Sequence, residues 1–204
     1  MPANLSLADI AVVIIALLVS MTIHEFMHAL VGYKLGDTTA LDEGRLSLNP
    51  LQHIDPVMTI LLPAITLLLF QTPILAAKPV PFNPDRVKYD EYGAALLAAA
   101  GPLSNLALAF IGALALGLFV PGSFLAQSVD IFVTLNVALF VFNLVPIPPL
   151  DGSRVLYAFA PEPLQEIMRQ IEPMGIFIIF ALVLFAGFGG VLLRLDQLVL
   201  NFLP

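Results

Sequence analysis

Two histidines and a glutamate near the start of the chain have the residue types and the spacing of a zinc site. The sequence reads His24-Glu25-Phe26-Met27-His28, so on a helix the two imidazoles project from one face, about one turn apart. This spacing lets both rings bind a single Zn²⁺ at ~2.0–2.1 Å. Glu25 is placed to act as general base for a water molecule that the metal polarises, rather than as a ligand. The pattern therefore predicts a hydrolytic zinc centre.

The same side chains have a purely structural explanation, in which two histidines are hydrogen-bonded between helices beside a neutral glutamate. Their surroundings argue against it, because they lie in the last third of an apolar stretch that runs from Ile10 to Val31. A charged carboxylate in the middle of a membrane helix costs about 2.5–3.5 kcal/mol, and such residues usually serve a function. His28 lies six residues before Lys34, which places the site roughly 9 Å below the membrane surface.

Two imidazoles leave a catalytic zinc ion one protein ligand short, because such sites usually have three protein ligands and a water molecule. The chain has no cysteine, and its third histidine falls outside the firm membrane segments. Asp151, which follows a long apolar run, is the best remaining candidate. Prolines at positions 146, 148 and 149 disfavour a helix there, and Gly152 permits a sharp turn. We therefore expect extended backbone that turns the carboxylate inward; the alternative is an ordinary Asp-Gly turn at the membrane surface.

The composition indicates that most of the chain is surrounded by lipid. Of the 204 residues, 59% are hydrophobic and only 11% are charged, and the mean hydropathy is +0.97; soluble domains are closer to ~45–50% and ~25%. Disorder is excluded, and a net charge of −7 with 8 Lys and Arg does not suit nucleic acid. The absence of cysteine excludes disulfides and thiolate sites. The length suits a single membrane-embedded domain over residues 1–204.

The hydropathy pattern predicts an all-α integral membrane protein with four or five membrane segments. Firm spans are expected over residues 10–31, 93–120, 128–145 and 174–193. A fifth apolar stretch, 57–77, contains Pro63, Gln71 and Pro73 and is either a span or a re-entrant hairpin. Alternation in Leu46-Ser47-Leu48 predicts minor β structure at the cytoplasmic edge. Residues 154–172, in which charged and apolar side chains alternate, predict an interfacial helix.

The positive charges predict the orientation in the membrane. If residues 57–77 re-enter, seven of the eight Lys and Arg residues fall on one side: Lys34, Arg45, Lys78, Arg86, Lys88, Arg154 and Arg169. We therefore favour re-entry, which buried non-helical backbone permits. The positive-inside rule then makes that side cytoplasmic, with the N-terminus outside and the site open toward the cytoplasm.

Three motifs together resemble those of the site-2 protease family of intramembrane zinc metalloproteases, over about residues 8 to 160. In chain order they are His24-Glu25-Phe26-Met27-His28, the weaker Gly101-Pro102-Leu103-Ser104-Asn105, and Asn143-Leu144-Val145-Pro146…Leu150-Asp151-Gly152. Residues 161–204 then hold the rest of the interfacial helix and the last span. The chain is similar to compact prokaryotic members, because it shows neither the PDZ nor the CBS domain of many relatives.

The resemblance implies one zinc ion bound by His24, His28 and Asp151, and a water molecule activated by Glu25. It also implies that Asn143 hydrogen-bonds the scissile carbonyl or its oxyanion. The implied substrates are transmembrane segments of membrane proteins of the cell membrane, cut for regulated release of a signalling segment or for clearance of signal-peptide remnants.

The sequence leaves two interpretations open for each of four polar residues. Asn143 is either catalytic or a C-terminal cap of its helix. Asn105 is either a hydrogen-bond partner between helices or a substrate contact, and we prefer the first. His53 and Asp55 either lie at the entrance of the site or form a turn.

A membrane metal transporter or a non-proteolytic scaffold is the rival function. Transporters carry ionisable residues along a path and broken helices in repeated halves. This sequence instead groups its candidate ligands and shows no internal repeat. Serine and aspartyl intramembrane proteases fit poorly, because their motifs are absent from the sequence.

Overall fold

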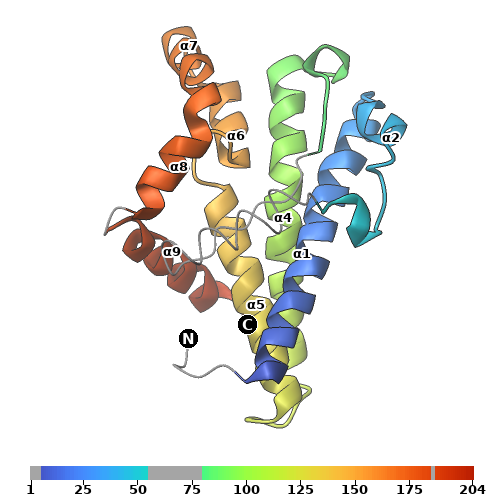
Figure 1. Ribbon diagram of the computed structural model, residues 1–204, viewed down its shortest axis with the longest axis vertical. Helices are drawn as coiled ribbons and strands as arrows, with labels where there is room; N and C mark the ends of the chain where they lie inside the picture. Colours follow the sequence, from blue (N-terminus) through green and yellow to red (C-terminus); the bar gives the residue numbers. More distant parts are fainter. Residues whose placement is uncertain (1–5, 55–79, 185–186) are drawn as a thin grey trace.

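Three long helices form the body of the molecule (Figure 1). The computed structural model describes residues 6–54, 80–184 and 187–204, and this part of the chain is helical, without a strand. Helix α1 spans Leu7–Lys34, α4 spans Asp90–Leu116 and α5 spans Phe124–Asn143. Each is long and apolar enough to cross a bilayer. These helices match the first three firm spans predicted from the sequence and make the chain a multi-pass membrane protein.

Local sequence explains where two of these helices begin. Ser6 caps α1, because its hydroxyl accepts a hydrogen bond from the Asp9 N–H at 3.1 Å while the Asp9 carboxylate accepts one from the Ser6 N–H at 2.9 Å. Ser123 caps α5 in the same position by accepting a bond from the Ala126 N–H. Both caps satisfy backbone donors that the first helical turn leaves free.

Helix α4 is the central element and packs against α1, α5 and α6. Its buried face is rich in alanine and glycine, and small residues let helix backbones approach closely in a membrane. At Gly112, for instance, a Cβ atom would lie 2.7 Å from the side chain of Val133 on α5. The small residues of α4 therefore bring its backbone close to its neighbours.

The C-terminal third departs from the prediction in two places. Instead of one interfacial helix over 154–172, the chain forms α6 (Asp151–Phe159) and α7 (Glu162–Ile171), because Pro161 cannot continue a helix. Instead of one span over 174–193, it forms α8 (Gly175–Leu184) and α9 (Phe188–Phe202). Glycines at positions 187, 189 and 190 weaken the helix at that junction.

Shorter elements connect the long helices. They are α2 (Thr39–Asp42) and the 3₁₀ turns Pro50–Gln52, Pro84–Arg86 and Glu172–Met174. Leu46–Leu48 forms bends and no strand, so the minor β structure is not confirmed in the described part of the chain. The re-entrant segment predicted over 57–77 lies outside the described residues, so the total number of membrane segments stays a prediction.

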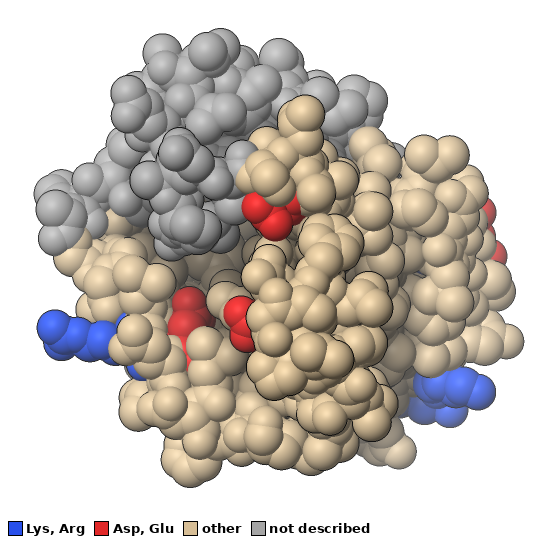
Figure 2. Space-filling model, turned by 90° about the horizontal axis from the view of Figure 1, so that it is seen from below, with Lys and Arg blue, Asp and Glu red and all other residues tan. Residues whose placement is uncertain are grey.

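Charged residues gather at one end of the molecule. The upper end in Figure 1 carries the end of α1, the start of α4, and α6 and α7. Basic residues on or beside these elements are Lys34, Arg86, Lys88, Arg154 and Arg169. The opposite end, seen in Figure 2, shows only a few separate charged residues on its described surface. This asymmetry is the one that the sequence predicts.

A buried carboxylate joins the segment that follows α1 to the segment that precedes α4. Asp37 is only 2% exposed, and it accepts hydrogen bonds from the Thr39 hydroxyl at 2.6 Å and from the backbone N–H of Asn83 at 2.7 Å. Burial alone would raise the pKa of Asp37. The bonds from Thr39 and Asn83 and the charge of Arg86 outweigh burial, so this pKa lies below its ordinary value of 3.8.

We expect Asp37→Ala to lower the free energy of unfolding by about 2 kcal/mol at neutral pH, because it leaves buried donors unpaired. The lowered pKa of Asp37 means that its stabilisation is fully present above the pKa of the unfolded chain. The stabilisation is lost as the pH falls through the folded-state value. Denaturation of both proteins in mixed micelles between pH 7 and pH 3 measures this difference. The difference in unfolding free energy between the two proteins should narrow only in the acidic range. A difference that stays constant with pH would contradict the lowered pKa of Asp37. The exposed neighbour Asp42 provides the control, since Asp42→Ala should change stability by less than ~0.5 kcal/mol.

Candidate metal centre

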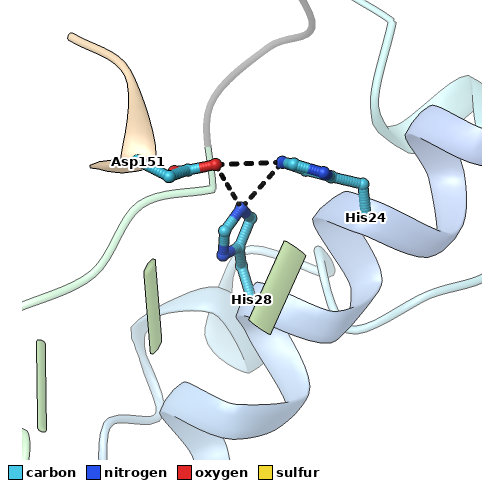
Figure 3. Close-up of side chains that lie close together, drawn as sticks. All are labelled: His24, His28 and Asp151. Atoms are coloured by element: carbon cyan, nitrogen blue, oxygen red, sulfur yellow. Dashed lines mark hydrogen bonds and ion pairs between the residues drawn. The ribbon is translucent and has the colours of Figure 1, made fainter. Parts of the chain in front are cut away.

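Three predicted ligands from two distant segments of the chain meet at one point. His24 and His28 lie on the same face of α1, and Asp151 is the first residue of α6. The two Nε2 atoms lie 3.0 Å apart. The Asp151 Oδ2 atom lies 3.2 Å from Nε2 of His24 and 3.3 Å from Nε2 of His28. Figure 3 shows the three side chains pointing toward one another, and they form a group that could hold a metal ion.

The geometry of these donors suits zinc. Ligand atoms ~2.0–2.1 Å from a tetrahedral ion lie about 3.3 Å from one another. The three observed separations, 3.0, 3.2 and 3.3 Å, are close to that value. Two imidazoles and a carboxylate are also among the ligand types of catalytic zinc, which keeps one further position for water or substrate.

Hydrogen bonds on the far side of each ring determine which nitrogen faces the metal. Nδ1 of His24 lies 2.6 Å from Oδ1 of Asn105, and Nδ1 of His28 lies 2.7 Å from the carbonyl oxygen of Leu97. A carbonyl oxygen can only accept, so in both rings Nδ1 carries the proton and donates it. Each Nε2 is left with a lone pair directed at the same point. Two lone pairs and an anionic carboxylate at such short range fit a bound cation.

Helix α4 supports both histidines through three positions on one face. Leu97, Gly101 and Asn105 are spaced by four residues and therefore lie along one stripe. A Cβ atom at Gly101 would lie 2.3 Å from Nε2 of His28 and 2.6 Å from Nε2 of His24. Glycine is required there, because any side chain would occupy the space where the two rings converge.

Asp151 is positioned differently from the sequence prediction. The prolines lie in non-helical backbone that is extended at Leu150, as predicted. Asp151 and Gly152, however, begin α6 rather than form a sharp turn, so that part of the prediction is wrong. Proline is compatible with the residues that precede a helix, which is why the prolines up to position 149 do not prevent a helix from starting at 151. Gly152 serves close packing: a Cβ atom there would lie 2.2 Å from the carbonyl oxygen of Leu144 at the end of α5.

The two residues predicted to take part in catalysis lie on the same elements as the ligands or next to them. Glu25 is buried on α1 between the two histidines in sequence. Asn143 is the last residue of α5, and its side-chain amide donates a hydrogen bond to the Leu139 carbonyl at 2.9 Å. That bond stays within α5, whose cap position is Leu144, so neither interpretation of Asn143 is decided by it.

The other polar residues considered in the sequence have different surroundings in the structure. Asn105 bonds to His24 on α1 and to Asn136 on α5, so the preferred interpretation as a partner between helices is confirmed. The sequence did not predict that one of these partners is His24, a proposed ligand of the centre; the spacing of four residues from Gly101 was the available signal. His53 is buried, and its Nε2 lies 2.8 Å from the Ser47 carbonyl, which favours a role in its own turn. Asp55 lies outside the described residues.

We expect Gly101→Ala to weaken zinc binding by at least about 100-fold, because the added methyl group displaces both rings. Zinc content after purification and zinc affinity measured by chelator competition test this. Gly117→Ala at the end of the same helix is the matched control, since the nearest atom to its Cβ would be 3.9 Å away. A Gly101→Ala protein that binds zinc as tightly as the Gly117→Ala protein would show that the rings do not meet as described.

Comparison with known proteins agrees with this geometry. The model of Peptidase family M50 matches residues 122–186, a segment that includes α5 and Asp151. Relatives of the chain that carry the name "Putative zinc metalloprotease" include the following three. YwhC of Bacillus subtilis is 40% identical over 193 residues, covering 88% of this chain and 83% of the relative. MJ0611 of Methanocaldococcus jannaschii is 33% identical, covering 75% and 73%, and Rip2 of Mycobacterium tuberculosis is 32% identical, covering 89% and 69%.

No solved structure matches the chain significantly. The similarity to YwhC nevertheless extends over most of both chains, and the donor set is one that zinc prefers. The chain therefore belongs to peptidase family M50, the site-2 protease family, and is a zinc-dependent metalloprotease of the membrane.

Proposed function

We propose that this metalloprotease cuts peptide bonds in or near the transmembrane helices of other membrane proteins, with one zinc ion held by His24, His28 and Asp151. The observation that carries the proposal is the convergence of three zinc-type donors, two of which lie on a helix long and apolar enough to cross the bilayer. Among the described residues this is the one group of potential metal ligands found. A single group suits a catalytic centre better than a transport path, which needs several sites in sequence.

The position of the centre supports a substrate within the membrane. His28 lies six residues before Lys34, the last residue of α1, so it is roughly 9 Å along the helix axis from that end. The side chain of Asp151 is 23% exposed, whereas those of His24 and His28 are 9% and 8% exposed. Water and substrate therefore reach the donors from the side of Asp151.

Different residues of the protein have different roles in hydrolysis. Zinc at this site supplies a Lewis acid that makes water a stronger nucleophile near neutral pH and polarises the peptide carbonyl. The Glu25 carboxylate accepts a proton as the water oxygen bonds to the carbonyl carbon. It then gives that proton to the amide nitrogen as the C–N bond breaks. The hydrogen bonds from His24 and His28 to α4 keep both rings oriented during these steps.

Asn143 adds a hydrogen-bond donor for the oxygen of the scissile carbonyl. It is the last residue of α5, and seven residues separate it from Asp151, the first residue of α6. In the free protein its amide donates to Leu139. Binding of substrate would exchange this bond for one to the developing oxyanion, where a single donor is worth ~2.7–4 kcal/mol in comparable enzymes.

The charge distribution supports an orientation in the cell membrane. The end of the molecule that carries most of the basic residues is also the end nearer the metal centre (Figure 1). By the positive-inside rule this end faces the cytoplasm and the start of α1 faces outward. The expected substrates are then cut close to their cytoplasmic end, as release of a signalling segment or removal of a signal-peptide remnant would require.

The proposed function is tested by cleavage of a labelled transmembrane peptide in liposomes by the purified protein. Glu25→Gln should retain one zinc ion yet lower the rate by about 10²–10⁴-fold, because it removes the general base and leaves the ligands in place. Glu91→Gln, at an exposed position in the first turn of α4, should keep the wild-type rate. Phenanthroline should stop the reaction and added zinc should restore it. A fully active Glu25→Gln protein, or cleavage that resists the chelator, would refute the mechanism.

For Asn143, we expect Asn143→Ala to lower kcat by about 10²–10³-fold with little change in KM. Ser128→Ala is the control, because the Ser128 hydroxyl makes the same kind of bond to the carbonyl four residues earlier on α5 and lies outside the proposed site. If Asn143 were only a helix cap, both variants would lower the melting temperature slightly and neither would change kcat.

A further inference from the structure

We infer that Asn136, on α5, is a positioning residue that fixes the orientation of His24 through Asn105. This inference rests on the proposed role of His24 as a zinc ligand. Asn136 makes no direct contact with the three proposed ligands among the hydrogen bonds of the described residues. Its side chain instead completes a chain of hydrogen bonds that links α5, α4 and α1.

In this series of hydrogen bonds, the donor and the acceptor of each bond are fixed. The amide nitrogen of Asn136 donates to the backbone carbonyl of Phe132 at 2.9 Å, and a carbonyl can only accept. The oxygen of the Asn136 side chain is therefore left to accept a bond from the Asn105 amide nitrogen, at 3.0 Å. The oxygen of Asn105 in turn accepts from Nδ1 of His24, at 2.6 Å.

The backbone carbonyl of Phe132 thus decides which nitrogen of His24 carries the proton. If the Asn136 side chain were lost, the Asn105 amide could rotate, because its remaining partner, the Ser20 carbonyl, is 3.4 Å away. A rotated amide would present N–H groups to Nδ1 and favour the tautomer with the proton on Nε2, which cannot bind a metal. We call the bonds from Phe132 through Asn136 and Asn105 to His24 the relay. His28 needs no such relay, because its Nδ1 bonds directly to the Leu97 carbonyl.

Burial keeps this series of hydrogen bonds rigid. Asn105 and Asn136 are both 0% exposed, so water cannot replace a missing partner, and a buried polar group without a partner is unfavourable. Hydrogen bonds that only hold membrane helices together contribute ~0.6 kcal/mol on average. A relay predicts something different, namely an effect on zinc affinity that depends on Asn105.

The test measures zinc affinity of the full-length protein in lipid nanodiscs by competition with a fluorescent chelator. Asn136→Leu, which keeps the size of the side chain but removes its polar atoms, should weaken zinc binding by about 10–100-fold. The absorption spectrum of bound Co²⁺ should shift, since the orientation of one ligand changes. In an Asn105→Leu background, the same Asn136→Leu change should alter zinc affinity by less than about 2-fold, because the relay is already broken.

The controls separate positioning from packing. Val137 is the neighbour of Asn136 and is also 0% exposed; Val137→Ala should lower the melting temperature and leave zinc affinity unchanged. Asn136→Ala, compared with Val137→Ala, replaces Asn136→Leu if that variant does not fold. Wild-type zinc affinity in the Asn136 variants, or an equal loss with and without Asn105, would overturn the relay. Retention of zinc by His24→Ala would instead refute the ligand assignment, whatever the Asn136 variants do.

Discussion

The structure depends on keeping three electron-rich atoms close together inside a membrane. Two imidazole lone pairs and a carboxylate oxygen lie within 3.0–3.3 Å of one another, an arrangement that is repulsive by itself and favourable around a divalent cation. The protein maintains it by fixing the opposite edge of each ring. The two acceptors that do so, the Leu97 carbonyl and the Asn105 side chain, both belong to α4. Helix α4 therefore shapes the centre although it contributes no ligand.

The composition of α4 follows from this role. To reach both rings, its backbone must come closer to α1 than ordinary side chains permit, and Gly101 makes that approach possible. Leu97 and Asn105, four residues before and after Gly101, then lie opposite His28 and His24, respectively. Alanines and a further glycine continue the close packing toward α5, where the core of Ala109, Ala113, Val133, Val137 and Val141 lies. Small residues therefore serve the chemistry and the packing of one helix together.

The sequence predicts which residues meet at the centre, because their spacing and polarity are properties of short segments of the chain. Two histidines four residues apart must share a helix face, and an aspartate after an apolar run must lie near a membrane surface. The sequence predicts the elements around Asp151 less well. The prolines before position 151 were interpreted as excluding a helix, whereas they only precede one. The break at Pro161 was visible in the sequence, but the amphipathic pattern on either side of it suggested one continuous helix.

The partner of Asn105 could not be predicted, because it depends on how α4 is rotated about its own axis. That rotation is determined by contacts with two other helices, and neither contact is encoded within α4. By the same reasoning, we expect zinc binding and assembly of this domain to be coupled. Zinc held by the three proposed ligands would join α1 to α6, while α4 separately contacts both of them. Any change that rotates α4 moves the acceptors behind the histidines, and so alters the zinc site without touching a ligand. The membrane helices and the metal centre are therefore stabilised by the same set of contacts.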